Sequence, residues 1–238
     1  MKPYDQTTDK KSQIRTMFDN IAPTYDRLNH LLSMNIDRLW RRRTARTAAS
    51  FNPSRILDVA TGTGDMAVAL ARRIPQAAIT GTDISEEMMR VARTKVAQLG
   101  LDGRIEFATG DAEHLAAADG SFDVVTAAFG VRNFEDIDAG LREMRRVLKE
   151  GGHLLVLELS TPRNRLFRRL YNLYSHRVLP RVGRMISHDG KAYEYLPASV
   201  DEFPAPAEFA RRVREAGFAR CENRSLGFGI AQLYIAKR

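Results

Sequence analysis

Hydrophobic residues near the start of the chain recur with helical spacing. Four of them lie at positions i, i+3, i+4 and i+7 of one helix face: Ile14, Met17, Phe18 and Ile21. Ser12 is a suitable N-cap residue for this helix. Pro23 interrupts the pattern, and a second apolar face runs from Leu28 to Trp40. We expect residues 12–50 to form a helical flap ahead of the main fold.

Beyond residue 53, short apolar runs alternate with helical patterns. Strands are predicted near 55–60, 77–82, 104–108, 122–128 and 153–158. Helices are predicted near 64–73, 86–99 and 138–149, and a turn at 150–152. This alternation is typical of parallel strands joined by crossover helices that cover both faces of a sheet. We therefore predict an α/β core with a mostly parallel sheet over 55–158.

Residues 159–203 break this alternation. They contain an arginine-rich stretch, with seven arginines from Arg163 to Arg184. A helix near 206–216 and two strands near 219–225 and 230–236 follow, which predicts a closing antiparallel hairpin and seven strands in total. Ligands of open α/β sheets bind at the carboxyl ends of the strands. We read 159–203 as a lid over that edge, 204–238 as the closing helix and hairpin, and the whole chain, 1–238, as one domain.

Composition limits the class of protein. A chain of 238 residues, 44% of them hydrophobic, can bury a full core as one domain. The single cysteine, Cys221, excludes an intrachain disulfide and favours a reducing compartment; we expect an ordinary thiol there. The N-terminus lacks a signal-peptide core, and no run approaches the roughly 18 apolar residues of a membrane span. We expect a cytoplasmic protein, or one peripheral to the cytosolic face of a membrane.

The net charge of +8 and the pI near 9.9 indicate an anionic partner: nucleic acid, anionic lipid or an acidic substrate. Basic residues also gather beside Trp40, at Arg41, Arg42, Arg43 and Arg46. Five apolar residues lie near helical spacing among the later arginines: Leu166, Phe167, Leu170, Leu173 and Tyr174. That segment is either a basic amphipathic helix lying on anionic lipid or a helix packed on the domain with its arginines in water. For the cluster beside Trp40, the alternative to contact with an anionic partner is a solvated basic face.

The segment from Ile56 to Asp65, ILDVATGTGD, reads as a buried strand that enters a glycine-rich turn. Gly62 and Gly64 fit the spacing of dinucleotide-binding turns. Asp58 and Asp65 flank this turn, however, and a pyrophosphate requires amide donors without acids beside them. Acids suit instead the ammonium and sulfonium of S-adenosylmethionine (SAM). The sequence thus favours a SAM-dependent methyltransferase over an NAD-dependent dehydrogenase, for which no hydride-handling residues are evident.

Other residues at strand ends fit the rest of SAM. Asp83 ends the second predicted strand and can accept hydrogen bonds from both ribose hydroxyls; its alternative role as a helix N-cap is already filled by Ser85. Asp111, after the third strand, can accept the adenine amino group, and we read the competing Glu113 as a helix-entry charge. Thr63 can donate its hydroxyl or amide to the methionine carboxylate.

Two partners are not expected. Enzymes that methylate amino groups of DNA or RNA usually carry an Asn/Asp-Pro-Pro-aromatic segment after the fourth strand. The corresponding residues 128–134 read AFGVRNF, so nucleic acid is not predicted as the substrate. The histidines lack metal-ligand spacing, so no metal site is predicted. The sequence leaves open whether two copies associate as a homodimer.

Several motifs in order give a specific resemblance: MFDNIAPTYD at 17–26, the turn at 58–65, FGVRN at 129–133, RVLKEGG at 146–152, LELSTP at 157–162 and AYEYL at 192–196. Together, from about Met17 to the C-terminus, they resemble the demethylmenaquinone methyltransferase family, which overlaps with the ubiquinone C-methyltransferases. The resemblance implies a class I methyltransferase fold and carbon methylation of a prenylated quinol ring, late in menaquinone synthesis.

The resemblance also implies SAM contacts at Thr63, Asp83, Asp111 and Ala112. One further family contact is often a serine just before the Phe-Gly-x-Arg-Asn segment. This chain has Ala128 there, so only a backbone contact remains.

Carbon methylation of a quinol needs an ionised ring hydroxyl, because the phenolate spreads negative charge onto the ring carbon. A phenol-like pKa near 10 leaves about one part in a thousand ionised at pH 7. The enzyme must therefore supply a base or a cation. We assign stabilisation of the quinolate to Arg132, which stays protonated; its alternative role is a salt bridge to Glu135 or Asp136.

The predicted lid adds further candidates. Asp189, or an ordered water, is our candidate base, and Tyr193 would close over the ring. His188 is a second choice for the base. In the N-terminal flap, Tyr25 and Asp26 are placed to shield the cofactor from water, with ordinary packing as the alternative for Tyr25.

Overall fold

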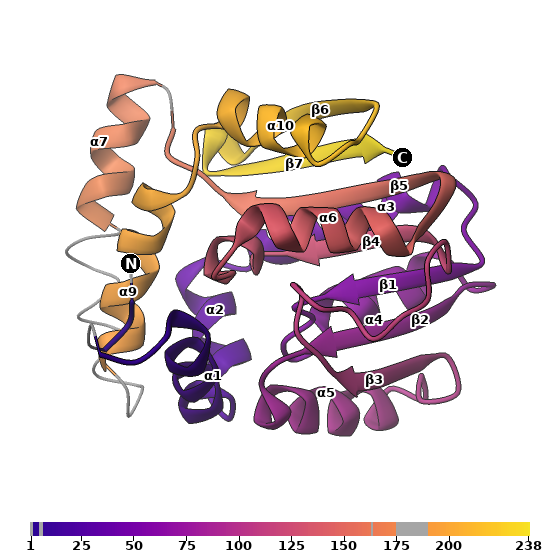
Figure 1. Cartoon of the computed structure of the whole chain (residues 1–238). Coiled ribbons are helices and arrows are strands. Elements are labelled where there is room, and N and C mark those ends of the chain that lie inside the picture. Colours follow the sequence, from indigo (N-terminus) through magenta and orange to yellow (C-terminus); the bar gives the residue numbers. More distant parts are fainter. Residues whose placement is uncertain (1, 5–6, 163, 175–189) are drawn as a thin grey trace.

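The computed structural model describes residues 2–4, 7–162, 164–174 and 190–238 (Figure 1). Its N-terminal region is helical, as predicted, and forms three helices: α1 (Lys10–Ile21), α2 (Tyr25–Leu32) and α3 (Ile36–Ala49). The prediction of Ser12 as N-cap is wrong, because the Asp9 carboxylate accepts a hydrogen bond from the Ser12 amide at 2.7 Å and caps α1.

The core is one seven-stranded sheet with the order β3-β2-β1-β4-β5-β7-β6. Its strands are β1 (Arg55–Val59), β2 (Ala78–Asp83), β3 (Ile105–Thr109), β4 (Phe122–Ala128), β5 (Leu148–Leu159), β6 (Arg220–Leu226) and β7 (Ala231–Lys237). The first five strands pair in parallel, and β7 runs antiparallel to both β5 and β6. The mostly parallel sheet and the closing hairpin are thus confirmed.

One predicted boundary is wrong. The turn expected at 150–152 lies inside β5, which begins at Leu148, and the register between β4 and β5 shifts there. Gly152 makes this possible, since a Cβ at that position would lie 2.8 Å from the Lys149 carbonyl oxygen. The glycines therefore form an irregularity within the strand rather than ending it.

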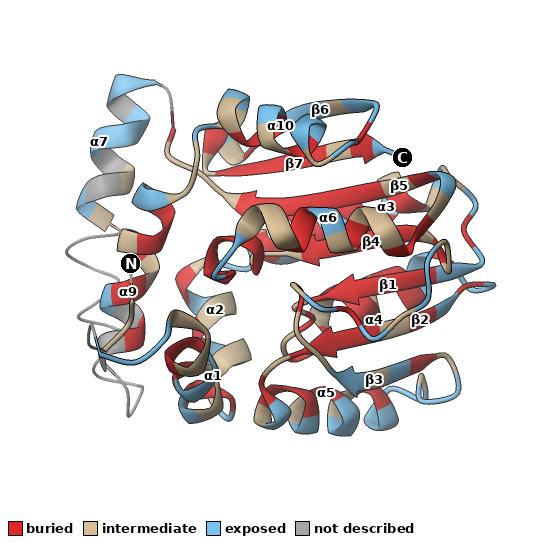
Figure 2. Ribbon diagram, in the orientation of Figure 1, coloured by how far each residue is buried: buried red, intermediate tan, exposed pale blue. Residues whose placement is uncertain are grey.

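Helices cover both faces of the sheet: α4 (Asp65–Arg73), α5 (Glu86–Gln98), α6 (Ile137–Val147) and α10 (Pro206–Glu215), with α3. Side chains of β5 alternate between two cores. Leu155 and Leu157 pack in the core that contains α3 and α4, whereas Leu154 and Val156 pack in the core with α6 and α10. Figure 2 shows the central strands buried between these layers. This alternation is the period of two that a doubly covered sheet requires.

The segment read as a lid contains α7 (Arg165–Leu173) and α9 (Gly190–Glu202) in its described parts. A third cluster of buried residues joins α9 to α1, α2 and α5, through side chains that include Ile14, Leu28, Met88 and Tyr195. Figure 1 shows α1, α2, α7 and α9 gathered at the end of the sheet toward which the parallel strands point. Within the described part of the chain, none of the helices combines the length and hydrophobicity that a bilayer span requires.

Candidate active site

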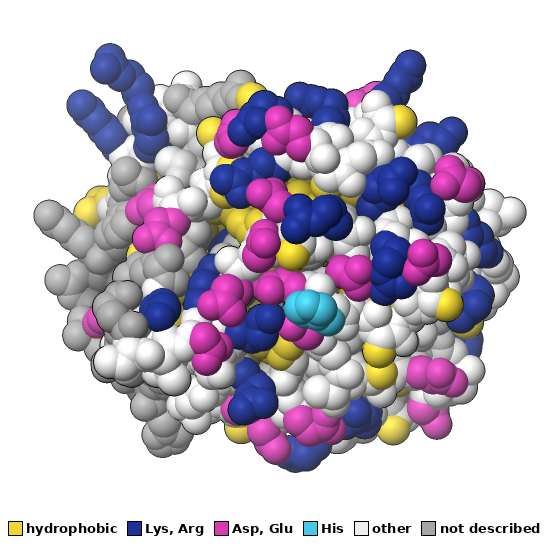
Figure 3. All heavy atoms as spheres, viewed as in Figure 1, with side chains coloured by type: hydrophobic (Ala, Val, Ile, Leu, Met, Phe, Trp, Pro, Cys, Tyr) yellow, Lys and Arg dark blue, Asp and Glu magenta, His cyan; other side chains and the backbone are white. Residues whose placement is uncertain are grey.

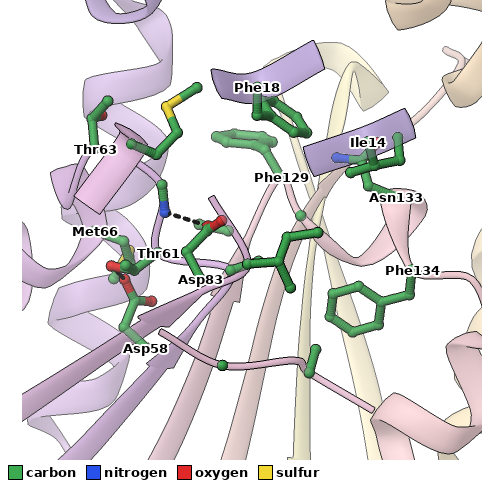
Figure 4. Close-up of a pocket in the computed structure, with 18 of the residues that line it drawn as sticks. Ile14, Phe18, Asp58, Thr61, Thr63, Met66, Asp83, Phe129, Asn133 and Phe134 are labelled. Atoms are coloured by element: carbon green, nitrogen blue, oxygen red, sulfur yellow. Dashed lines mark hydrogen bonds between the residues drawn. The ribbon is translucent and has the colours of Figure 1, made fainter. Parts of the chain in front are cut away.

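A pocket opens at the carboxyl ends of the central parallel strands. Its walls come from the segments that follow β1, β2, β3 and β4, and α1 covers it. Figure 4 shows Ile14 and Phe18 of α1 on one side and Asp58 and Asp83 on the other. Of the predicted cofactor residues, Asp58, Gly62, Thr63, Asp83, Asp111, Ala112 and Ala128 line it. Gly64 instead precedes α4 at the N-cap position, with φ of 80°.

Asp58 is fully buried at the base of this pocket. Its two oxygens accept hydrogen bonds from the hydroxyls of Thr61, at 2.6 Å, and Thr126, at 2.5 Å. Burial raises the pKa of Asp58 to about 6 despite these donors. A cation in the pocket would therefore stabilise the ionised carboxylate.

Asp83 ends β2 with its carboxylate at the pocket wall. One oxygen accepts the Gly62 amide at 2.8 Å, the bond drawn in Figure 4, and the other accepts the Ser85 amide at 2.9 Å. Ser85 itself caps α5 through the Met88 amide, as the sequence predicted. Burial raises the pKa of Asp83. Each carboxylate oxygen retains capacity for another donor, which suits the two ribose hydroxyls of SAM.

The loops after β1 and β4 touch beside this carboxylate. Ala60 and Phe129, one residue beyond each strand, have positive φ values of 51° and 62°. A Cβ at Gly130 would lie 2.5 Å from the Ala60 Cβ, so only glycine permits this approach. Unfavourable backbone conformations at two adjacent strand ends are typical of a functional site.

The flap is fastened to the pocket by polar contacts that the sequence did not reveal. Asp26 accepts the Thr63 hydroxyl at 2.5 Å and pairs with Lys95 at 2.6 Å. Asp19 of α1 accepts the Ser85 hydroxyl at 2.6 Å. The Thr63 hydroxyl is therefore directed to the flap, which leaves its amide as the group for a methionine carboxylate.

Glu113 has a different role from the one predicted. No helix begins there; instead its Oε1 accepts the amides of Glu135 and Asp136, at 2.8 and 3.1 Å. Lys11 of α1 contacts both Glu113, at 3.0 Å, and Asp111, at 2.6 Å. Glu113 thus holds two loops together, and Asp111 remains the half-buried acid at the pocket edge.

The buried polar groups of the pocket fit SAM. Among the described residues, neither Asp58 nor Asp83 forms an ion pair with lysine or arginine, although both are buried. Asn133, in the same wall, has a buried Oδ1 without a hydrogen-bond partner among those residues. Buried carboxylates without a cationic partner, together with a buried amide oxygen without a donor, suit a ligand that carries cationic and N–H groups.

A second, mostly apolar cavity adjoins the cofactor pocket. Tyr25, Arg41 and Phe129 line both cavities and so form a shared wall. The rest of its lining comes from α2, α3, the β5 end and the 159–203 segment, including Leu32, Trp40, Leu159, Tyr171, Tyr174 and Leu196. Arg41, predicted as part of a basic surface cluster, is buried here with its guanidinium 4.9 Å from the Phe129 ring centre.

Arg132 also lines the apolar cavity. It pairs neither with Glu135 nor with Asp136 but with the fully buried Glu158, at 2.7 Å. Burial acts to lower the pKa of Arg132, but the Glu158 carboxylate and the neighbouring tyrosines together outweigh it, and the pKa is raised. Its Nε contacts the Ser199 hydroxyl at 3.3 Å. The guanidinium is therefore charged and held in place.

The remaining candidates come from the predicted lid and from the closing hairpin. Asp189 and His188 fall outside the described residues, and Tyr193 lies within α9. Cys221 is on β6, where burial raises the pKa of its thiol to about 11, as suits an unreactive cysteine.

The strand order reverses between β1 and β4, and the glycine turn bordered by acids lies at this point of the sheet. These two features define a class I SAM-dependent methyltransferase, whose methyl donor is SAM. The model of the ubiE/COQ5 methyltransferase family matches residues 6–238, and the chain belongs to that family.

Three relatives illustrate the similarity. The demethylmenaquinone methyltransferase of Bacteroides fragilis is 47% identical over all of this chain and 97% of its own length. That of Deinococcus radiodurans is 46% identical over 99% of this chain and 97% of its length. The ubiquinone/menaquinone biosynthesis C-methyltransferase UbiE of Geobacter sulfurreducens is 47% identical over 97% of this chain and 90% of its length.

Solved structures agree on the fold. A SAM-dependent methyltransferase from Thermotoga maritima superimposes with a TM-score of 0.65 at 20% identity, covering 93% of this chain and 98% of its own. The [4+2]-cyclase SpnF gives 0.58 at 21% identity over 96% of each chain. Because a cyclase shares this architecture, the fold alone does not specify the reaction.

Proposed function

We propose that this protein transfers a methyl group from SAM to a ring carbon of demethylmenaquinol, a prenylated quinol, and so forms menaquinol. The observation that carries the proposal is the apolar cavity behind the shared wall of Tyr25, Arg41 and Phe129. Its lining of aliphatic and aromatic side chains suits an isoprenoid tail and a fused ring. Relatives at 46 to 47% identity carry the name demethylmenaquinone methyltransferase.

Arg132 is the proposed stabiliser of the quinolate. Among the described residues, none accepts a hydrogen bond from its Nη2, while Glu158 and Ser199 hold the rest of the side chain. A fixed, charged donor on the cavity wall lowers the energy of a ring oxygen that becomes negative as the carbon is methylated. Tyr193 of α9 and Asp189 stay candidates for closing the site.

The test is an anaerobic assay with purified protein, SAM and chemically reduced demethylmenaquinol, run beside the matching ubiquinol precursor. Mass spectrometry would detect one added methyl group. We expect methylated naphthoquinol. If SAM binds but neither quinol gains a methyl group, the substrate assignment is wrong while the class of enzyme stands.

A second candidate is dual specificity for naphthoquinol and benzoquinol precursors. The Geobacter sulfurreducens relative, at 47% identity, has a name that covers both pathways. Methylation of both quinols in the same assay would establish it. Methylation of another small or lipid molecule is the remaining alternative, and the aromatic lining of the cavity favours a ring over an acyl chain.

The protein would work at the cytosolic face of a membrane, where a prenylated quinol resides. Helix α7 presents three exposed arginines, Arg165, Arg168 and Arg169, and Figure 3 shows basic side chains projecting at the corner that α7 occupies. The exposed Phe167 and Phe228 stack on each other there, with ring centres 4.6 Å apart. Apolar rings beside cations suit an anionic lipid surface. Residues 159–203 would act as the lid. The reaction would need neither a metal ion nor a nucleic acid partner.

A further inference from the structure

A row of ionisable side chains connects the apolar cavity with the protein surface. Asp37 of α3 lines the apolar cavity, whereas His30 and Asp65 line a shallow open depression. His30 lies between the two acids: its Nδ1 is 2.9 Å from Asp37 Oδ2, and its Nε2 is 3.4 Å from Asp65 Oδ2. The Asp37 side chain is 7% exposed and that of His30 14%. The imidazole therefore lies between Asp37, at the apolar cavity, and Asp65, which lines both the open depression and the cofactor pocket.

Two basic side chains pair with the acids of this row. Asp37 also binds Arg41 and accepts the Ser33 hydroxyl at 2.6 Å. Asp65 pairs with Lys95 at 2.7 Å, and Lys95 also pairs with Asp26. Burial acts to raise the pKa of Asp65, but the cations Arg41 and Lys95 outweigh it and lower that pKa. Three carboxylates thus face two permanent cations, and the imidazole lies between two of those carboxylates.

We propose that Asp37 is the base that takes the hydroxyl proton from the quinol, and that His30 carries this proton to the surface. The inference rests on the proposed function. Arg41 binds Asp37 and lines both cavities, so the base lies one hydrogen bond from a residue that borders both the quinol cavity and the SAM pocket. Asp37, as the base, and Arg132, as the cation that stabilises the quinolate, would then act on the same ring oxygen.

The O–H bond of the ring hydroxyl breaks, and its proton goes to the Asp37 carboxylate. The electron pair spreads to the ring carbon, which forms a bond to the methyl group as the methyl–sulfur bond breaks with its pair on sulfur. The resulting ring ketone regains its hydroxyl when the hydrogen on the methylated carbon moves to the oxygen. One proton is released per methyl group, and it leaves Asp37 through the His30 ring to water in the depression.

The experiment compares wild-type protein with Asp37→Asn and His30→Gln. The single-turnover rate of methyl transfer to reduced demethylmenaquinol is measured from pH 6 to 10 at saturating SAM, together with the Kd for SAM and the melting temperature. For Asp37→Asn we expect the single-turnover rate at pH 7 to fall about 100-fold or more, with the Kd for SAM unchanged. Its rate should then rise about tenfold per pH unit, because the hydroxyl ionises without help as its pKa near 10 is approached. His30→Gln should lose less and regain rate with added imidazole.

Matched controls are Asp123→Asn and His153→Gln. Asp123, near the start of β4, accepts hydrogen bonds from the backbone amides of Ser54 and Arg55. His153, in β5, stacks on Phe51. Both residues lie away from the cofactor pocket and the apolar cavity. Both should transfer methyl groups at the wild-type rate at every pH. If Asp37→Asn does not fold, the pH profile and imidazole response of His30→Gln decide.

A wild-type rate in both site variants, or a loss that is equal at all pH values, would overturn the relay and leave the proposed function intact. Failure of the wild-type protein itself to methylate demethylmenaquinol would instead overturn the proposed function, and the relay with it.

Discussion

At the scale of single residues, the buried Asp58 gives SAM binding a pH dependence. Its folded-state pKa of about 6 lies above the ordinary value of 3.8. Between these values the folded protein binds more protons than the unfolded chain, so stability without ligand falls as pH rises from about 4 to about 6. A bound cation favours the carboxylate. SAM binding should therefore release a proton near pH 5 to 6, and affinity should weaken by up to about tenfold per pH unit below 6.

Isothermal titration calorimetry at pH 5, 6 and 7.5, in buffers of different ionisation enthalpy, measures both quantities. Asp58→Asn should bind SAM more weakly at pH 7.5 and lose most of this pH dependence. Equal affinity of the wild-type protein at pH 5 and 7.5 would contradict the assignment.

Arg132 is the second residue whose chemistry can be isolated. The Arg132→Lys variant keeps the charge but cannot reach Glu158, Ser199 and a ring oxygen together, because an ammonium lacks the planar fork of guanidinium. We expect turnover of reduced demethylmenaquinol to fall by about 100-fold, with the Kd for SAM within threefold of wild type. Unchanged turnover would remove Arg132 from the mechanism.

At the scale of elements, α1 and α2 should respond to the cofactor. Asp26 fastens them to the glycine turn through Thr63 and Lys95. Asp26→Ala removes charge-assisted bonds of about 1.5 to 3 kcal/mol each, so SAM should dissociate roughly tenfold faster or more. Hydrogen exchange should quicken in residues 10–32, and SAM should slow it in the wild-type protein.

The control for this change is Glu208→Ala, which removes a surface acid paired with Arg211 on α10. Its exchange in residues 10–32 should match wild type. Identical SAM dissociation from both variants would show that the flap is not fastened through Asp26.

Local patterns predicted the elements well because periodicity and turn chemistry are properties of neighbouring residues. The acids at the ends of β1 and β2 were found for the same reason, since parallel strands bring their carboxyl ends to one edge. Contacts between distant residues were not accessible in this way. Glu158 pairs with Arg132 from 26 positions away, and the burial of Arg41 depends on how α3 packs on the sheet. Tertiary packing decided these cases.

At the scale of the whole molecule, the exposed rings near α7 should govern membrane binding. Phe228 is 76% exposed. Burial of such a side chain in lipid contributes about 1.5 to 3 kcal/mol, so Phe228→Asp should weaken binding to vesicles rich in anionic lipid by roughly tenfold or more. Flotation with and without 30% phosphatidylserine, at low and high salt, measures this.

Leu99→Asp is the matched control, since Leu99 is also exposed but lies at the end of α5. It should float like wild type, and both variants should methylate a short-tailed quinol normally. Flotation of the wild-type protein that is independent of anionic lipid would contradict the proposal.

The shared wall of Tyr25, Arg41 and Phe129 has a kinetic consequence. Side chains of α1 and α2 cover the cofactor pocket, whereas α7 and α9 contribute lining to the apolar cavity that the cofactor pocket does not share. We therefore expect the two substrates to enter by separate routes and to bind in either order. S-adenosylhomocysteine should compete with SAM yet inhibit noncompetitively against the quinol. The flap has to open to exchange S-adenosylhomocysteine for SAM, so the rate of opening should set an upper limit on turnover, however fast the quinol diffuses in the membrane.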